Sequence, residues 1–261
     1  MQRTIASWDE FKTNWGGTQN FLMADECVPF AFQFPPLEEI VEALRRHPET
    51  NIHPGVKGAA MVTSSIADTF RELPLEEAMR SQFSIAHYHL SPFDVPGGFL
   101  EGFKESVLDK WQEAMRDQGF TWTRCYPIIF ISGIGCATNY HMDFSHVVAW
   151  QIYGTKLFNG LLDPNRWAPH DLRMTNSNQL AMPAEITPAD SVSYTMGPGT
   201  VLWNTLLTPH WVEASTQVAM SVNISHGGLR LNGELCPFEQ ELMDWREANP
   251  DKAPGLPRGV Y

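Results

Sequence analysis

From about residue 124 to residue 225 the sequence consists of short runs rich in β-branched and aromatic residues, separated by glycine and proline. The runs read CYPIIFISG, HVVAWQIYG, TKLFNGLL, GTVLWNTLL, PHWVEAS and TQVAMSVNIS. Strands this short, joined by turns of this kind, pack into a β-sandwich or close into a β-barrel. This part of the chain constrains the fold most, and it predicts a mainly β core.

The rest of the chain is typical of helices. Residues 35–49 (PPLEEIVEALRRHPE) begin with prolines and acids and end with arginines, which is the charge order of a helix. Residues 73–83 and 97–120 are two further helix predictions, and residues 236–250 predict a C-terminal helix. Residues 83–91 (FSIAHYHLS) alternate between apolar and polar residues and predict a strand.

A chain of 261 residues can bury a full hydrophobic core, so we expect a single domain spanning residues 1–261. We expect a helical N-terminal part that adds at least one strand to the core, then a β core with a loop-like insert, then a C-terminal helix and tail. Their ranges are 1–123, 124–228, about 162–196 for the insert, and 229–261. Loops as long as this insert are often functional.

The composition limits the function classes. Hydrophobic residues make up 43% and charged residues 18%, which is typical of a folded globular protein. A net charge of -12 repels phosphate backbones, so we do not expect nucleic acid as a partner. No apolar run predicts a membrane span or a signal peptide, and the four cysteines form no C-x-x-C pair. We therefore expect a cytoplasmic protein that contacts no membrane.

The stretch YHMDFSHVVAWQ carries an imidazole and a carboxylate at the entrance of a predicted strand. His141 and Asp143 are two residues apart, which places both side chains on one side of an extended segment. A second histidine from a distant run would complete the two-histidine, one-carboxylate set that binds Fe(II) with open positions. His210 in TPHWVEAS is the candidate. Taken singly, His141 is better explained as a capping or loop residue and His210 as a hydrogen-bonded core residue.

Lys156 lies inside the apolar run GTKLF. It is either a surface lysine whose stem covers apolar neighbours or a cationic anchor inside the β core for a co-substrate carboxylate.

The order His-x-Asp, Gly-x-Lys, Pro-Gly, His over residues 125–226 resembles the JmjC and cupin-like family of Fe(II)/2-oxoglutarate-dependent oxygenases. The resemblance implies a double-stranded β-helix, the jelly roll of the cupins, with N-terminal helices and a C-terminal helix. It implies His141, Asp143 and His210 as metal ligands and Lys156 as the partner of the far carboxylate of 2-oxoglutarate. It also implies three further co-substrate contacts: Thr138, Tyr88 and Asn223.

The departures from the family pattern are informative. Some relatives bind 2-oxoglutarate through an arginine soon after the distal histidine, but the nearest arginine after His210 is the remote Arg230, which favours Lys156. The turn before His210 reads Pro-Gly-Thr where the family often has Pro-Gly-Asp. Halogenating relatives replace the carboxylate with glycine or alanine, so Asp143 favours hydroxylation.

The resemblance therefore predicts an enzyme that uses Fe(II), 2-oxoglutarate and O2 to hydroxylate a C–H bond of a small molecule or an amino-acid side chain. Two alternatives remain open: a cupin-like metal-binding protein without turnover, and a hydrolase or isomerase that uses another divalent metal at the same ligands. The substrate, demethylation as the outcome, the role of the insert and a homodimeric state also remain open. His87 with His89, and His146, are weaker candidates for the site.

Overall fold

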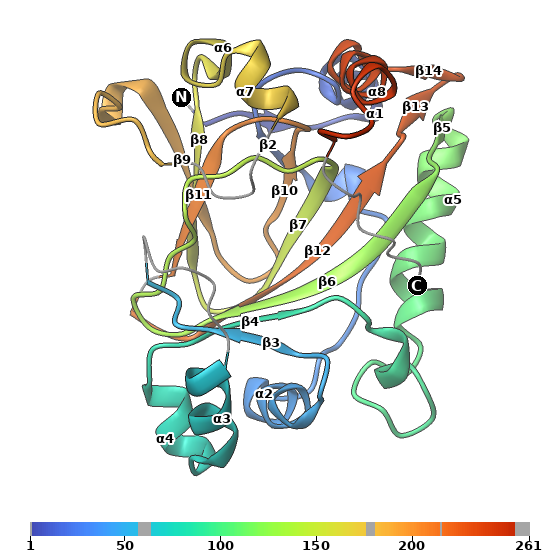
Figure 1. The fold of residues 1–261 in the computed structure, drawn as a ribbon. Coiled ribbons are helices and arrows are strands. Elements are labelled where there is room, and N and C mark those ends of the chain that lie inside the picture. Colours follow the sequence, from blue (N-terminus) through green and yellow to red (C-terminus); the bar gives the residue numbers. More distant parts are fainter. Residues whose placement is uncertain (1, 57–63, 176–180, 215, 254–261) are drawn as a thin grey trace.

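The computed structural model describes residues 2–56, 64–175, 181–214 and 216–253, and the statements below concern these ranges. Within them, eight strands form one sheet in the order β1-β2-β10-β7-β12-β6-β4-β3 (Figure 1). Every neighbouring pair of this major sheet is antiparallel except β1 with β2. The strands are β1 Thr4–Ile5, β2 Phe21–Met23, β3 Asn51–His53, β4 Ser84–His87, β6 Arg124–Ser132, β7 His146–Tyr153, β10 Val201–Asn204 and β12 Ala219–Gly227.

A second, minor sheet has the antiparallel order β11-β8-β9. Its strands are β8 Lys156–Leu161, β9 Ser191–Met196 and β11 His210–Ala214. The segment 137–141 extends this sheet, because Ala137 bridges Glu213 and His141 bridges His210. The two sheets pack face to face, since residues of β7 and β10 share one apolar cluster with residues of β8 and β9. This arrangement is a jelly roll.

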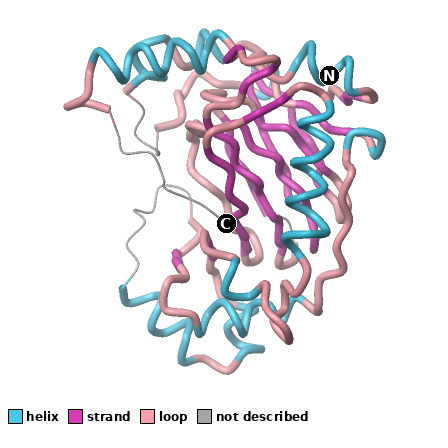
Figure 2. The backbone as a smooth tube through the Cα atoms, turned by 90° about the vertical axis from the view of Figure 1, so that its right-hand side faces the viewer, coloured by secondary structure: helices cyan, strands magenta, loops and turns pink. Residues whose placement is uncertain are grey.

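The helices lie around the two sheets. They are α1 Trp8–Asn14, α2 Leu37–Arg46, α3 Ser64–Glu72, α4 Leu75–Arg80, α5 Lys110–Asp117, α6 Pro164–Trp167, α7 His170–Met174 and α8 Pro237–Ala248. In Figure 1, α6, α7 and α8 lie at one end of the strands, α2, α3 and α4 at the other, and α5 runs beside the major sheet. Figure 2, turned by 90°, shows the strands between these groups. No helix in the described ranges is long and apolar enough to cross a membrane.

The main hydrophobic core lies on the outer face of the major sheet, under the N-terminal helices. Trp203 of β10 contacts Phe11 of α1, with ring centroids 4.8 Å apart. Strand β12 shows how the sequence separates the two faces: Val222 and Ile224 belong to this core, whereas Ser221 and Asn223 alternate with them and face the space between the sheets.

Most predicted strands are present, and the differences have physical reasons. The predicted runs after residue 124 correspond to β6, β7, β8, β10, β11 and β12. The insert is not loop-like through residue 196: its last residues form β9, whose buried residues alternate with exposed ones and which pairs with β8. Helices α6 and α7 also lie in it. The helix predicted over 97–120 begins only at Lys104, as a π-helical stretch Lys104–Asp109 followed by α5.

The shortest elements were not predicted from the sequence. Strands β1, β2 and β3 have two or three residues each, and their hydrogen-bond partners come from elsewhere in the chain. Short 3₁₀ helices span Asp25–Cys27, Ser91–Phe93 and Pro188–Asp190, and the small strands β5 Phe120–Thr121, β13 Arg230–Leu231 and β14 Glu234–Leu235 form a separate sheet.

Two histidines are buried in the outer core, and hydrogen bonds fix their tautomers. His226 Nε2 accepts a hydrogen bond from Trp111 Nε1 at 2.7 Å, so its hydrogen is on Nδ1, which faces the His146 carbonyl at 3.3 Å. His146 Nδ1 accepts from the Leu206 amide at 3.2 Å, so its hydrogen is on Nε2. Burial lowers the pKa of His146 to about 3 and that of His226 to about 4, so both are neutral near pH 7.

Glu239, 4% exposed, joins α8 to the end of β12. Its carboxyl group accepts hydrogen bonds from the amides of Gly228 and Leu229, and its Oε2 lies 3.7 Å from His146 Nε2. The contact with His146 is not an ion pair, because that ring is neutral. Burial raises the pKa of Glu239 to about 7, even though the two amides lower it.

We expect the stability of Glu239→Gln, compared with that of the wild type, to increase as the pH rises. The folded-state pKa of about 7 exceeds the unfolded value of 4.5, so the folded state binds the proton more tightly and stability falls as the pH rises from 4.5 to 7. Glutamine cannot ionise. Between pH 5 and pH 8, the difference in unfolding free energy should shift toward the variant by up to about 3 kcal/mol. Urea unfolding at both pH values measures this.

The matched control is Glu247→Gln, an exposed carboxylate on the same helix. The difference in unfolding free energy between this variant and the wild type should stay constant over this pH range. A constant difference for Glu239→Gln as well would mean that Glu239 ionises normally in the folded protein.

Candidate metal centre

Two histidines that are distant in the sequence form one hydrogen-bonded backbone pair. The His141 amide donates to the His210 carbonyl at 3.0 Å, and the His210 amide donates to the His141 carbonyl at 2.9 Å. Residues paired in this way have side chains on the same side of the sheet. The two imidazole centroids are therefore only 4.2 Å apart, and Phe158 of β8 stacks on His210 at 4.9 Å.

Both imidazoles present Nε2 to the same point. His141 Nδ1 lies 2.7 Å from the Asn139 carbonyl, and His210 Nδ1 lies 2.9 Å from the Thr208 carbonyl. A carbonyl only accepts, so each Nδ1 carries a hydrogen, and in the neutral form of each ring the lone pair is on Nε2. Burial, with a smaller effect of His141, lowers the pKa of His210 to about 4 and keeps that ring neutral. Neutral imidazoles with free Nε2 lone pairs are the form that binds metals.

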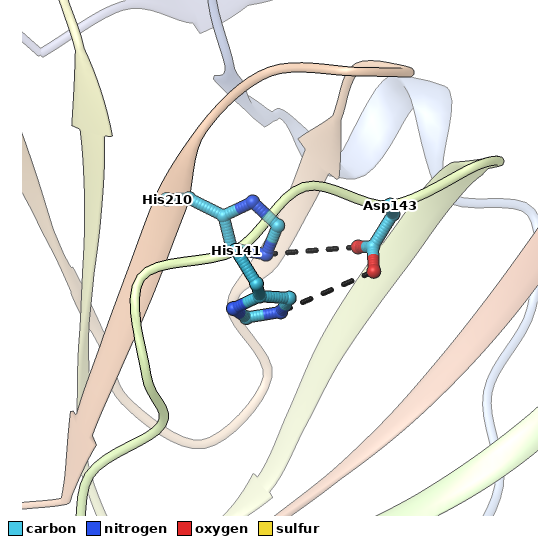
Figure 3. A group of neighbouring side chains, drawn as sticks. All are labelled: His141, Asp143 and His210. Carbon is cyan, nitrogen blue, oxygen red and sulfur yellow. Dashed lines mark ion pairs between the residues drawn. The ribbon is translucent and has the colours of Figure 1, made fainter. Parts of the chain in front are cut away.

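The carboxylate of Asp143 completes the group, as Figure 3 shows. Its Oδ1 lies 4.0 Å from His141 Nε2 and its Oδ2 lies 3.6 Å from His210 Nε2. One donor atom from each of the three residues lies within 4.8 Å of the others. Two nitrogens and one oxygen around one point fit a divalent transition metal with bonds of about 2.0–2.2 Å. The residues present therefore fit the predicted metal.

Lys156, 5% exposed, starts β8 and faces the space between the sheets. Its Nζ donates to the Phe130 carbonyl and to Ser221 Oγ, both at 3.1 Å. No carboxylate of the described residues lies within ion-pair distance of it, and burial lowers its pKa to about 7. The surface-lysine interpretation is wrong, because the whole side chain is enclosed. A buried ammonium without an acid is unfavourable unless a ligand supplies the negative charge.

The structure also gives the surroundings of the other three predicted contacts. Thr138 Oγ1 accepts a hydrogen bond from the Val212 amide at 2.8 Å and retains its own hydrogen to donate. Tyr88 follows β4 and is 36% exposed, with its ring 6.4 Å from that of Phe130. Its pKa is raised, mainly by burial and also by Tyr126 and Asp143. Asn223 Oδ1 is buried and accepts no hydrogen bond from a described residue.

The weaker candidates lie outside this site. Both ring nitrogens of His87 are engaged, by Thr50 Oγ1 at 2.8 Å and by the His89 carbonyl at 2.9 Å. His146 forms a second buried group with Cys236 and Glu239. That group does not suit a metal, because the hydrogen on His146 Nε2 occupies the only position that faces the other two residues.

Two residues, one in contact with the site and one beside it, were not found from the sequence. Asn204 ends β10 and donates from Nδ2 to Asp143 Oδ2 at 2.8 Å. Arg124 begins β6 opposite Gly227 and donates to Ser145 Oγ at 3.1 Å, two residues after Asp143. A Cβ at Gly227 would collide with the Arg124 guanidinium, so glycine makes room for it. The only sequence signal for either residue is a lone polar side chain at the end of an apolar run.

Comparisons with known proteins bear on the fold. No protein-family model and no curated protein sequence matches this chain. YcfD, a ribosomal oxygenase from Escherichia coli, is similar in structure: the TM-score is 0.52 and the identity 14%, over 98% of this chain and 59% of that one. An X-ray structure of E. coli ycfD gives the same TM-score and identity, over 100% and 62%.

The chain has a JmjC- and cupin-like jelly-roll fold. The predicted fold class is therefore confirmed. A cupin superfamily protein from Desulfitobacterium hafniense also matches 41% of this chain and 74% of that one, with 10% identity and a TM-score of 0.27, which is too low to support an argument. The chain spans about 60% of the length of the E. coli protein, 59% and 62% in the two structures.

Proposed function

We propose that this protein is an Fe(II)- and 2-oxoglutarate-dependent oxygenase that hydroxylates a C–H bond of a small molecule or an amino-acid side chain. The observation that carries the proposal is Lys156. A buried ammonium without an acid partner lies in the same space between the sheets as the His141, Asp143 and His210 group. A dianion that bridges a metal and this lysine would satisfy both, and 2-oxoglutarate has that shape and charge.

In this proposal each residue has a definite task. His141, Asp143 and His210 hold Fe(II), and the backbone carbonyls behind the imidazoles fix their Nε2 atoms toward it. Lys156 binds the far carboxylate, and the hydroxyl of Thr138 is free to donate to the same ligand. Bound Fe(II), with 2-oxoglutarate and O2, supplies the oxidation of the C–H bond, with release of succinate and carbon dioxide. The apolar walls around Phe158 exclude water from the reacting groups.

The proposed substrate class rests on the structural neighbour and on the net charge, which are less specific than the residues of the site. The E. coli neighbour is a ribosomal oxygenase. This chain carries a net charge of -12, which disfavours contact with the RNA surface of a ribosome, so we propose a small molecule or an amino-acid side chain. A cytoplasmic location without nucleic-acid or membrane partners belongs to the same proposal, and a homodimer remains an alternative to a monomer.

The two alternative functions use the same residues. A hydrolase or isomerase would need the metal but not 2-oxoglutarate, and Lys156 would then have no ligand-related role. A cupin-like binding protein would need neither O2 nor turnover. Binding of 2-oxoglutarate to the metal therefore separates the oxygenase from both alternatives.

The test is an anaerobic titration of metal-free protein with Fe(II) and 2-oxoglutarate, monitored by the weak visible charge-transfer band of the chelate. We expect the band in the wild type and in His89→Ala, a control that removes an exposed histidine. We expect no band in His141→Ala. A folded wild-type protein that binds metal but gives no band would contradict the oxygenase proposal and leave the two alternatives.

A further inference from the structure

Asn204 connects the candidate metal centre to the major sheet. It is the last residue of β10, is 1% exposed, and pairs with Val147 near the start of β7. Its Nδ2 donates to Asp143 Oδ2 at 2.8 Å. The same turn also holds the Asp143 main chain, because the Leu207 amide donates to the Asp143 carbonyl at 2.9 Å. Both the backbone and the carboxylate of Asp143 are therefore fixed by the segment that leads to His210.

The orientation of the Asn204 amide is determined by chemistry. An ionised carboxylate only accepts hydrogen bonds, so the amide must present its NH2 group to Asp143. Its Oδ1 then points away from Asp143, is buried, and accepts no hydrogen bond from any residue that the structure describes. A buried carbonyl oxygen without a donor destabilises a fold. This acceptor is therefore expected to meet a donor that the chain itself does not supply.

We infer that Asn204 is a positioning residue for the metal. By binding Oδ2 of Asp143, it would leave Oδ1 as the oxygen that holds the ion, so that a further position of the ion would stay open. Its own Oδ1 accepts a hydrogen bond from a water molecule or from an N–H or O–H group of a substrate next to the metal. 2-Oxoglutarate in its ionised form cannot be this donor, since it carries only acceptors. The inference rests on the proposed function, because it requires a metal at His141, Asp143 and His210.

An amide meets both requirements at this position, whereas a carboxylate or an aliphatic side chain of similar size does not. An aspartate would place a second carboxylate next to Asp143, and like charges at this distance repel. An aliphatic residue would leave Asp143 Oδ2 free to rotate and to bind the ion together with Oδ1. The amide supplies a donor without adding charge to a site that already contains a carboxylate.

The experiment uses Co(II) as the probe, without O2 or 2-oxoglutarate, because its visible bands report both binding and coordination number. In Asn204→Ala we expect the dissociation constant for Co(II) to rise about 10- to 100-fold. We also expect the bands to change as Asp143 becomes bidentate. Asn204→Ser keeps a shorter donor and should give an intermediate value, and it serves as the test if the alanine variant does not fold.

The matched control is Asn159→Ala. Asn159 is also a buried asparagine of the jelly roll, but its Oδ1 accepts from Ser193 Oγ at 2.6 Å and it contacts no metal-centre residue in the structure. This variant should lose stability yet keep the Co(II) affinity and spectrum of the wild type. Unchanged affinity and bands in a folded Asn204 variant would overturn the inference. A wild-type protein that binds no Co(II) would instead refute the proposed function.

Discussion

Replacing Lys156 with methionine is expected to weaken 2-oxoglutarate binding about 10³-fold and, at the same time, to stabilise the ligand-free protein. The ammonium is enclosed between the sheets and, among the described residues, donates only to the Phe130 carbonyl and Ser221 Oγ. A carboxylate bound there without its cation would be a buried, unpaired charge, which costs about 3–5 kcal/mol. Methionine has a similar length and no charge.

The stability effect follows from the pKa of Lys156, which burial lowers from 10.5 to about 7. The unfolded chain therefore binds the proton more tightly, and the lysine destabilises the fold. The destabilisation is full below pH 7, shrinks as the pH rises toward 10.5, and vanishes above that value. Its upper bound is about 5 kcal/mol. Since methionine leaves two acceptors without a donor, we expect a net gain of roughly 3 kcal/mol at pH 7.

Two measurements on the same protein test this. Calorimetric titration of the Mn(II)-loaded protein with 2-oxoglutarate gives the affinity, and urea unfolding of the metal-free protein at pH 7 gives the stability. Lys110→Met is the control, because Lys110 is exposed and forms a surface ion pair with Glu113 on α5. It should change neither quantity appreciably. Wild-type affinity in Lys156→Met would show that this lysine does not bind the co-substrate.

The second large effect is loss of stability in acid. The folded-state pKa values of His146 and His226, about 3 and about 4, lie below the unfolded value of 6.5. The unfolded chain therefore takes up protons first, and stability falls as the pH drops below 6.5. Together the two residues remove up to about 8 kcal/mol by pH 3, which is comparable to the whole stability of many domains. Protonation of Glu239 below pH 7 opposes this loss only in part.

His226→Asn isolates one of the two contributions. The amide does not titrate, so the loss of stability that it causes at pH 7 should shrink by about 2 kcal/mol at pH 5. Urea unfolding followed by tryptophan fluorescence at both pH values gives this difference. His89→Asn, at an exposed position, should show no such change. An equal loss at both pH values in His226→Asn would mean that the buried ring ionises in the folded protein as it does in the unfolded chain.

The sequence predicted the elements whose own residues follow a regular apolar pattern. The strands after residue 124 were predictable because apolar residues recur between glycines and prolines, and the same pattern located Lys156 within a strand. Strand β9 was not predicted, although its buried residues alternate with exposed ones. This alternating run is short and lies within a long insert that otherwise has no such pattern. The strands β1, β2 and β3 carry almost no pattern of their own and exist because longer strands pair with them.

The side chains that would bind the metal were predictable from the sequence, but the groups that hydrogen-bond to those side chains were not. His141 and Asp143 are neighbours, and His210 was chosen because it begins a later strand. The carbonyl partners that set the tautomers, and the amide of Asn204, depend on the register between strands. Register is a property of pairs of strands, and a single sequence does not state it.

The backbone pair between His141 and His210 also concerns the order in which the molecule is assembled. His141 and Asp143 are close in any conformation of the chain, but His210 joins them only when β11 has paired with segment 137–141. Contacts between such distant residues form late, because a long loop must close first. A newly made chain thus lacks the third donor until the minor sheet is complete. Binding of the proposed metal would then depend on completed folding of the minor sheet.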